Sequence, residues 1–271
     1  MPPSAIPPWH PPARGGPLPA LPPPFSAAPS VFAFSLAKAG STLLNDLLRV
    51  LAPAAGLAFF SIEDALFASG IPAPIDWPQA ARLFHPRGYC YGGFRAMPRH
   101  PLPPLASCRA VLLVRDPRDM IVSQFHSFRA SHLVPEDAGP DHPMHRAREA
   151  AQRQTLAQFA PGAAQRFARR FEGYLAQGFA FRETTAVFRY EDVVFAKRAW
   201  VEGLCAWFGW DLHEAVRAEA AARFDVLPAA ADPARHIRQV HPGNHLSEMS
   251  AATRAQVEAV LAESMTAFGY R

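Results

Sequence analysis

The residues of this chain that could do chemistry fall into two short groups, each following an apolar run. The first is Lys38-Ala39-Gly40-Ser41-Thr42, and the second starts at Arg115 and reaches Ser123. Lys and Arg supply positive charge, and Ser and Thr supply hydroxyl donors. Gly40 allows a tight turn in which successive N–H groups point at one ligand. Both groups therefore predict binding of a phosphate or sulfate.

The surroundings of the first group predict a strand, a turn and a helix. Residues 31–34 are a compact apolar run, typical of a strand buried on both faces. Leucines recur with helical spacing after Thr42, so a helix should begin near Ser41 with its free N–H groups facing the turn. The alternative is an ordinary strand–turn–helix with a glycine in the turn.

The second group has the same surroundings. Residues 111–114 form another buried-type strand, which ends on Arg115. Asp116 suits an N-cap, Pro117 the first helical position, and Asp119 the third position of a capping box. Ligands bind at the carboxyl ends of strands in open parallel sheets, so Arg115 with Ser123 should hold a terminal phosphate. The alternative is that Arg115 only pairs with a neighbouring aspartate.

The order of residues in the first group argues against ATP. An ATP-binding P-loop reads G-x-x-x-x-G-K-[ST], with lysine after the last glycine. Here Lys38 precedes Gly40, and Ser35 stands where the first glycine would be. The loop is therefore a phosphate-binding loop of another type. We call this loop and the group of Arg115 and Ser123 the two phosphate grips.

At these residues the chain resembles sulfotransferases that use 3′-phosphoadenosine 5′-phosphosulfate (PAPS) as sulfuryl donor. The resemblance covers residues 31 to about 268. It implies that Lys38 to Thr42 bind the 5′-phosphosulfate, and that Arg115 and Ser123 bind the 3′-phosphate. Two weaker features agree: residues 187–192 place Tyr190 near the adenine, and residues 236–244 resemble a late loop that closes over the nucleotide.

The chain departs from the family pattern around the adenine and in the late loop. Leu43 stands where cytosolic members commonly have a Trp that stacks on adenine. Gln239 and Val240 replace the usual Lys and Gly of the late loop, so only Arg238 is carried over as a cofactor-binding residue. The two phosphate grips remain, and we expect donor binding to persist.

The catalytic base has several candidates. Small-molecule members of the family carry a His before the second motif, but Arg95 or Ala96 falls at that position here. Carbohydrate-directed members use a Glu after the second strand, which is expected at 56–62 and is followed by Glu63. Glu63 is the first choice for the base. The alternatives are Asp64 and the histidines 85, 100 and 126.

With Lys38 and Glu63 as catalytic residues, the resemblance implies transfer of a sulfuryl group from PAPS to a hydroxyl or amine. The acceptor is expected to be a carbohydrate or small molecule, and no metal is expected. One alternative function is a catalytically inactive nucleotide-binding or partner protein of the same fold. A less favoured one is a P-loop kinase.

Composition sets the broad class. The chain has 271 residues and a formal net charge of +4, without a Lys/Arg run that would indicate nucleic-acid binding. No apolar stretch reaches the roughly 18 residues of a membrane span. Cys90, Cys108 and Cys205 lack paired spacing and are expected to be reduced thiols, which together with the missing span predicts a cytoplasmic protein. The oligomeric state is left open.

The order of elements predicts one α/β domain at 30–271, preceded by a proline-rich flexible segment at 1–29. Alternating strands and helices indicate a mostly parallel sheet flanked by helices. Strands are expected at 31–34, 56–62, 109–115 and 185–190. Helices are expected from Ser41, after the strand at 56–62, over 117–131, and near 145–160, 163–177, 193–208, 211–223 and 249–268. The stretches 71–105 and 132–145 are expected to be irregular and to wall the acceptor pocket.

Overall fold

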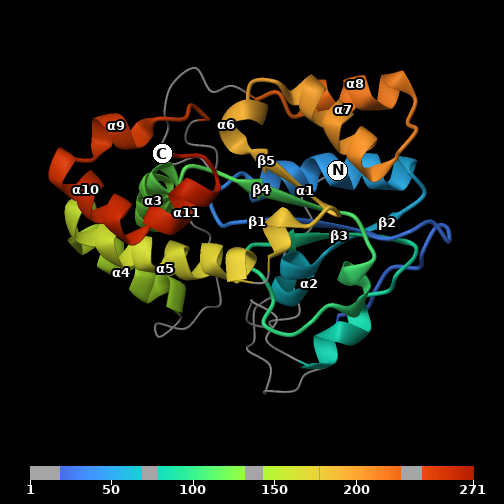
Figure 1. Ribbon diagram of the computed structural model, residues 1–271, viewed down its shortest axis with the longest axis horizontal. Helices are drawn as coiled ribbons and strands as arrows, with labels where there is room; N and C mark the ends of the chain where they lie inside the picture. Colours follow the sequence, from blue (N-terminus) through green and yellow to red (C-terminus); the bar gives the residue numbers. More distant parts are fainter. Residues whose placement is uncertain (1–18, 69–77, 132–142, 177, 227–239) are drawn as a thin grey trace.

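The chain folds around one five-stranded parallel sheet, with the strand order β2-β3-β1-β4-β5 (Figure 1). This computed structural model describes residues 19–68, 78–131, 143–176, 178–226 and 240–271. All four ladders of the sheet are parallel, as the sequence predicted. The strands are β1 (Val31–Ser35), β2 (Ala58–Ser61), β3 (Tyr89–Phe94), β4 (Ala110–Val114) and β5 (Thr185–Arg189).

Helices cover both faces of the sheet. In Figure 1, α1, α7 and α8 lie over one face, and α2 and α5 lie on the other. The helices are α1 (Ser41–Ala54), α2 (Ile62–Ala68), α3 (Pro117–His126), α4 (Pro143–Arg153), α5 (Leu156–Ala176), α6 (Tyr190–Val193), α7 (Lys197–Phe208), α8 (Glu214–Arg223), α9 (Asn244–Glu248), α10 (Ala251–Val260) and α11 (Ala262–Ala267).

The central strand β1 is buried on both faces because each face is covered by helices. Phe32 and Phe34 point into a core shared with α3, α5 and α10. Val31 and Ala33 point the other way, into a core shared with α1, α7 and α8. Successive side chains of a strand alternate between faces, so an apolar run without alternation requires two apolar partners.

The structure corrects the expectation of an irregular stretch over 71–105. This stretch contains β3, which lies between β2 and β1 and so occupies the interior of the sheet. The expectation rested on the glycines and prolines of this stretch, which include Gly92 and Gly93. A Cβ at Gly93 would lie 2.4 Å from the Ser61 hydroxyl oxygen. The glycines therefore allow a close approach between neighbouring strands instead of breaking the strand.

Several helix boundaries also differ from the expectations. The helix expected over 163–177 begins earlier, as α5 at Leu156, and continues through Pro161. The segment expected as one helix over 249–268 is divided at Leu261 into α10 and α11, and α9 precedes it. The helix over 117–131 is present as α3, followed by a π-helical turn at Ser127–Ser131.

The folded part of the chain begins before residue 30. The Tyr89 hydroxyl donates to the Pro22 carbonyl at 3.1 Å, and the Ser26 hydroxyl donates to the Gly56 carbonyl at 2.7 Å. Pro29 forms an isolated bridge with Arg87. Residues 19–29 thus pack on the amino ends of the sheet, and residues 1–18 lie outside the described part.

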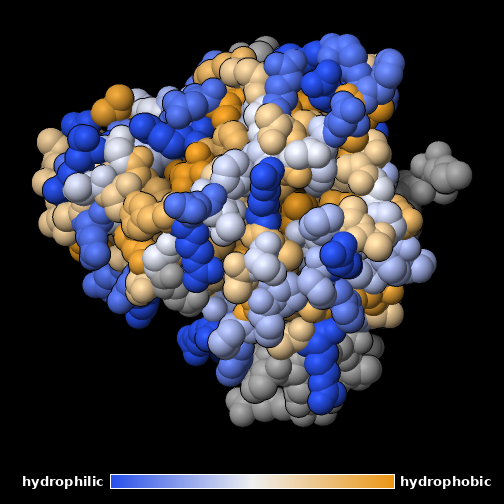
Figure 2. Space-filling model, turned by 45° about the vertical axis from the view of Figure 1, so that its right-hand side comes forward, coloured by the Kyte–Doolittle hydropathy of each residue, from blue (hydrophilic) through white to orange (hydrophobic). Residues whose placement is uncertain are grey.

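The surface shown in Figure 2 mixes hydrophilic and hydrophobic residues without one dominant apolar area. Among the described residues, no helix is both long enough and apolar enough to cross a membrane.

Candidate functional site

One residue at or just beyond the carboxyl end of each strand contributes to a single row of charged and aromatic side chains. In the spatial order of the strands these are Glu63 after β2, Arg95 after β3, Lys38 after β1, Arg115 after β4 and Tyr190 after β5. Because all strands are parallel, their carboxyl ends meet at one edge of the sheet, where ligands of open α/β sheets bind. This edge is the candidate active site.

The loop between β1 and α1 presents its backbone to that edge. Lys38 has φ +70° and Gly40 has φ +93°, so the chain passes twice through the left-handed region. The Ala39 N–H donates to the Leu36 carbonyl at 3.1 Å and closes the turn. Helix α1 then begins at Ser41, and no side chain caps it at Gly40. Its amino end, with the partial positive charge of the helix, suits an anion.

Gly40 is required here by its neighbour as well as by its conformation. A Cβ at Gly40 would lie 2.9 Å from Cδ2 of Tyr190, closer than real contacts allow. The Tyr190 ring is buried and its hydroxyl donates to the Val240 carbonyl at 3.0 Å. The aromatic ring therefore sets the position of the phosphate loop from behind.

Arg115 lies over the ring of Tyr190. Its guanidinium carbon is 4.3 Å from the centre of the Tyr190 ring, and its Nη1 donates to the Lys38 carbonyl at 3.4 Å. The side chain is only 6% exposed. Its Nε has no hydrogen-bond partner among the described residues. Ser123 lies two turns into α3, half-buried, on the helix that follows Arg115.

The alternative that Arg115 serves only as the partner of an aspartate does not satisfy its donors. The Arg115 Nη2–Asp119 Oδ2 distance is 3.8 Å, which is long for an ion pair. Asp119 has shorter bonds elsewhere: its Oδ2 accepts from the Gly243 N–H at 2.6 Å, and its Oδ1 accepts from the His245 N–H at 3.0 Å. The His245 Nδ1 lies 2.7 Å from the same Oδ1.

These bonds correct the expectation of a capping box. Asp116 does cap α3, because its carboxylate accepts from the Arg118 N–H at 2.9 Å. Asp119 instead reaches across to the segment before and within α9. Burial raises the pKa of Asp119, but the hydrogen bonds from His245 and the charge of Arg115 outweigh burial and lower it. Asp119 thus stays ionised and joins α3 to the described part of the late loop.

The phosphate loop carries an excess of positive charge. Burial, reinforced by the charges of Arg95 and Arg115, lowers the pKa of Lys38 to about 8. The protonated ammonium is destabilised in the free protein because desolvation and two like charges act on it without a matching anion. An anion bound at this loop would reverse that effect.

A nucleotide with two separate phosphate groups fits these residues. The buried Arg115 Nε without a partner among the described residues and the like charges around Lys38 each call for an anionic ligand. Lys38 and the amino end of α1 would hold one phosphate, and Arg115 with Ser123 the other. No group of three metal-ligating side chains occurs within the described residues.

Glu63 lies at the opposite end of the row, in the first turn of α2. Its Oε1 accepts from the Arg95 N–H at 3.0 Å, and its Oε2 is 3.0 Å from the Arg95 Nη1. Burial raises the pKa of Glu63, and the Arg95 guanidinium and Arg170 only partly oppose this. A half-buried carboxylate with a raised pKa is suited to accept a proton.

The other candidate bases have different surroundings. Asp64 is exposed and pairs with Arg49 at 3.4 Å. His126 contacts the Glu248 carboxylate, and His85 is exposed. His100 lies in the segment after β3, half-buried. Glu63 contacts Arg95, another member of the row. Arg238 lies outside the described residues.

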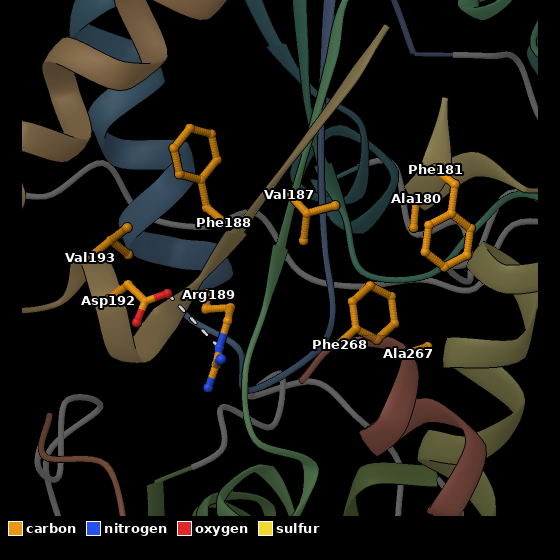
Figure 3. Close-up of a pocket in the computed structure, with 9 residues that line it drawn as sticks. All are labelled: Ala180, Phe181, Val187, Phe188, Arg189, Asp192, Val193, Ala267 and Phe268. Carbon is orange, nitrogen blue, oxygen red and sulfur yellow. Dashed lines mark ion pairs between the residues drawn. The ribbon is translucent and has the colours of Figure 1, made fainter. Parts of the chain in front are cut away.

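A separate hollow of about 380 Å³ follows the outer edge of β5, between this strand and α11 (Figure 3). Its lining is mainly apolar, with Val187 and Phe268 facing it, and includes the Arg189–Asp192 ion pair at 3.9 Å. No member of the row lines this hollow. We therefore assign the candidate active site to the row at the strand ends.

The sulfotransferase domain family matches residues 97–260, more than half of the chain. The chain belongs to this family. The prediction of a PAPS-dependent sulfotransferase is thereby confirmed. A search of curated proteins finds no match.

Solved structures of similar fold match most of the length of this sulfotransferase. Mouse sulfotransferase SULT7A1 complexed with PAP has a TM-score of 0.58 and 17% identity, and the match covers 88% of this chain and 84% of that one. Retinol dehydratase with androsterone and the inactive cofactor PAP has a TM-score of 0.52 and 16% identity, with 89% and 82% covered. These likenesses confirm the predicted α/β fold.

Sequence reasoning missed three residues at the candidate site of the sulfotransferase. Arg95 was noticed only as the residue at the position of a family histidine, yet it joins Glu63 to the Lys38 side of the row. Asp119 was interpreted as a local cap. Arg170, on α5, was not singled out, yet the charges of both Glu63 and Arg95 act on it. Of these three residues, only Asp119 had a signal in the local sequence, namely its i, i+4 spacing from Arg115.

Proposed function

We propose that this sulfotransferase transfers the sulfuryl group of PAPS to a hydroxyl acceptor, with Lys38 on the donor side and Glu63 as the base. The observation that carries this proposal is the order of the row. A general base and a cation for the leaving phosphate are needed on opposite sides of the sulfur in an in-line transfer. Glu63 and Lys38 stand on either side of Arg95 in that row.

The donor side is assigned as follows. Lys38 and the N–H groups at Gly40, Ser41 and Thr42 hold the 5′-phosphosulfate, whose sulfuryl group is the one transferred. Arg115 and Ser123 hold the 3′-phosphate. The position of Arg115 on Tyr190, with one guanidinium nitrogen unpartnered, supports this assignment. Tyr190 lies behind both phosphate grips, so its role is to set their separation.

The acceptor side contributes the proton transfer. The ionised Glu63 carboxylate removes the hydroxyl proton as the acceptor oxygen forms a bond to sulfur. The bond between sulfur and the bridging oxygen breaks, and its electron pair stays on the phosphate oxygen. Lys38 and the amino end of α1 stabilise that developing charge. The products are a sulfate ester, the nucleotide bisphosphate and a proton on Glu63.

The test combines nucleotide binding with transfer. Melting temperature is measured with 3′-phosphoadenosine 5′-phosphate and with ATP–Mg, and transfer is followed with ³⁵S-labelled PAPS and hydroxyl acceptors. We expect stabilisation by the bisphosphate and label in a sulfate ester. Stabilisation by ATP–Mg alone would contradict the proposal. Bisphosphate binding with no transfer to any acceptor would favour an inactive nucleotide-binding protein.

A further inference from the structure

Helix α5 brings an additional arginine, Arg170, to the acceptor end of the row. The Tyr174 hydroxyl donates to the Ser35 carbonyl at 2.9 Å, at the carboxyl end of β1. A Cβ at Gly173 would lie 3.4 Å from Cβ of Met97, in the segment that follows β3. This part of α5 therefore packs directly over the strand ends. Arg170 is one helical turn before Tyr174 and on the same face.

Arg170 is close enough to the base to interact with it. The Glu63 charge raises the pKa of Arg170, while burial and the charge of Arg95 lower it by more. Arg170 is half-buried, and its guanidinium carbon lies 5.9 Å from the centre of the Phe167 ring. Arg166, one turn earlier, is exposed and lies over Phe159.

The charges at this end do not balance among the described residues. Glu63 is paired with Arg95 at 3.0 Å. Within the described part of the chain, neither Arg170 nor Arg166 has an ion pair. The donor phosphates belong to Lys38 and Arg115, on the other side of Arg95. The Arg170 guanidinium, on which the Glu63 charge acts, thus remains for whatever enters beside Glu63.

We propose that Arg170 binds an anionic group of the acceptor, so that the acceptor is a hydroxyl compound that itself carries a carboxylate or sulfate. A guanidinium binds such a group through two parallel hydrogen bonds, which orients the acceptor as well as attracting it. The hydroxyl that reacts would be held at Glu63 by this second contact. This inference rests on the proposed function for the identity of the reacting edge.

The first experiment compares acceptors that differ in one charge. p-Nitrophenyl β-D-glucuronide is compared with the β-D-glucoside, and 4-hydroxyphenylacetate with 4-hydroxyphenylethanol. We expect kcat/KM for the anionic member of at least one pair to be about tenfold higher or more, the discrimination of one satisfied charge-assisted contact. Equal or better use of the neutral member in both pairs would overturn the inference.

Variants of α5 then locate the preference. Arg170→Gln should lower kcat/KM for the preferred anionic acceptor by about tenfold to a hundredfold, much more than for its neutral counterpart. Arg170→Lys should recover part of the loss, because charge returns without the planar fork. Arg169→Gln, at an exposed position next in the helix, is the matched control and should keep the preference. An equal fall for both acceptors would mean that Arg170 only supports Glu63.

Binding separates this inference from the proposed function. Each acceptor is titrated calorimetrically into protein saturated with 3′-phosphoadenosine 5′-phosphate. If the anionic acceptor binds in a manner that depends on Arg170 but no transfer occurs, the proposed acceptor site stands and the proposed sulfuryl transfer is contradicted. If transfer occurs but does not depend on the charge of the acceptor, the proposed sulfuryl transfer stands and the proposed acceptor site is contradicted. The acceptor-site inference would likewise be overturned if neither anionic probe binds at a concentration about tenfold above the Kd of its neutral counterpart.

Discussion

Arg115 and Tyr190 form a stacked pair, with the guanidinium carbon 4.3 Å from the ring centre. The same ring leaves no room for a side chain at Gly40. One aromatic residue thus contacts both phosphate grips, which come from loops far apart in the sequence. The distance between the two grips is set by the thickness and position of this ring, and the nucleotide must match it.

Substitution of Tyr190 should therefore affect donor affinity according to the ring that remains. Tyr190→Leu removes the surface under Arg115 and should weaken binding of 3′-phosphoadenosine 5′-phosphate by about fivefold or more, since a buried cation–π contact contributes about 1–2 kcal/mol. Tyr190→Phe keeps the ring and loses the bond to Val240, so its loss should be smaller. Titration calorimetry measures both; a larger loss for the Phe variant would contradict this role of the ring.

Gly40→Ala should impair both the loop and the ring behind it. The variant places a side chain at φ +93° and against Tyr190, at a cost of about 1–2 kcal/mol from conformation alone. We expect a lower melting temperature and weaker bisphosphate binding. Gly203→Ala in α7 is the control, because its Cβ would meet only Phe188 at an ordinary 3.5 Å and helical propensity should stabilise it. Equal behaviour of the two variants would refute the steric argument.

Donor affinity should depend on pH through Lys38. The pKa of Lys38 is lowered to about 8 in the free protein, and only its protonated form attracts the phosphate. Affinity for 3′-phosphoadenosine 5′-phosphate should be flat below that pH and fall by up to tenfold per unit above it. Calorimetry from pH 6.5 to 9.5 tests this. Lys38→Met should bind weakly with a flat profile; a persisting slope would assign the titration to another group.

Turnover should depend on pH through Glu63 in the opposite sense. The pKa of Glu63 is raised above that of an ordinary carboxyl group. As the pH falls, Glu63 therefore becomes protonated, and stops acting as a base, at a higher pH than an ordinary carboxyl group would. kcat should fall on the acid side, and Glu63→Gln should lower kcat by about 10²–10⁴-fold while the bisphosphate still binds. Asp64→Asn is the matched control on the same helix. Unreduced turnover in the Gln variant would move the base elsewhere.

Asp119→Asn should loosen the connection between α3 and the segment before α9. The ionised carboxylate accepts three bonds from Gly243 and His245, and an amide oxygen and nitrogen cannot replace them all. We expect a loss of about 1–3 kcal/mol in the free energy of unfolding. Denaturant unfolding measures this, with the exposed Asp192→Asn as control. Because the pKa of Asp119 is lowered, its contribution should be present at neutral pH and be lost as the pH falls below its ordinary value of 3.8.

The elements that carry the phosphate grips could be predicted because their signals are local. The strand–turn–helix at Lys38 and the Asp116 cap with Pro117 each lie within a dozen residues, where backbone rules apply. β3 could not be recognised because Gly92 and Gly93 resemble a turn in sequence. Their role depends on Ser61 and Asn45, whose side chains approach from other elements. Asp119 was misassigned for the same reason, since its partners are more than a hundred residues away.

The sequence by itself determined the α/β class and the sulfotransferase family and predicted the two anion grips, because loop geometry and helix termini are encoded by neighbouring residues. Only the tertiary structure decided the spatial order of the strands, and with it the row from Glu63 through Arg95 and Lys38 to Arg115. The ladder order follows from burial on both faces, which no single segment specifies. The pairing of Glu63 with Arg95 and the approach of Arg170 follow from that order alone.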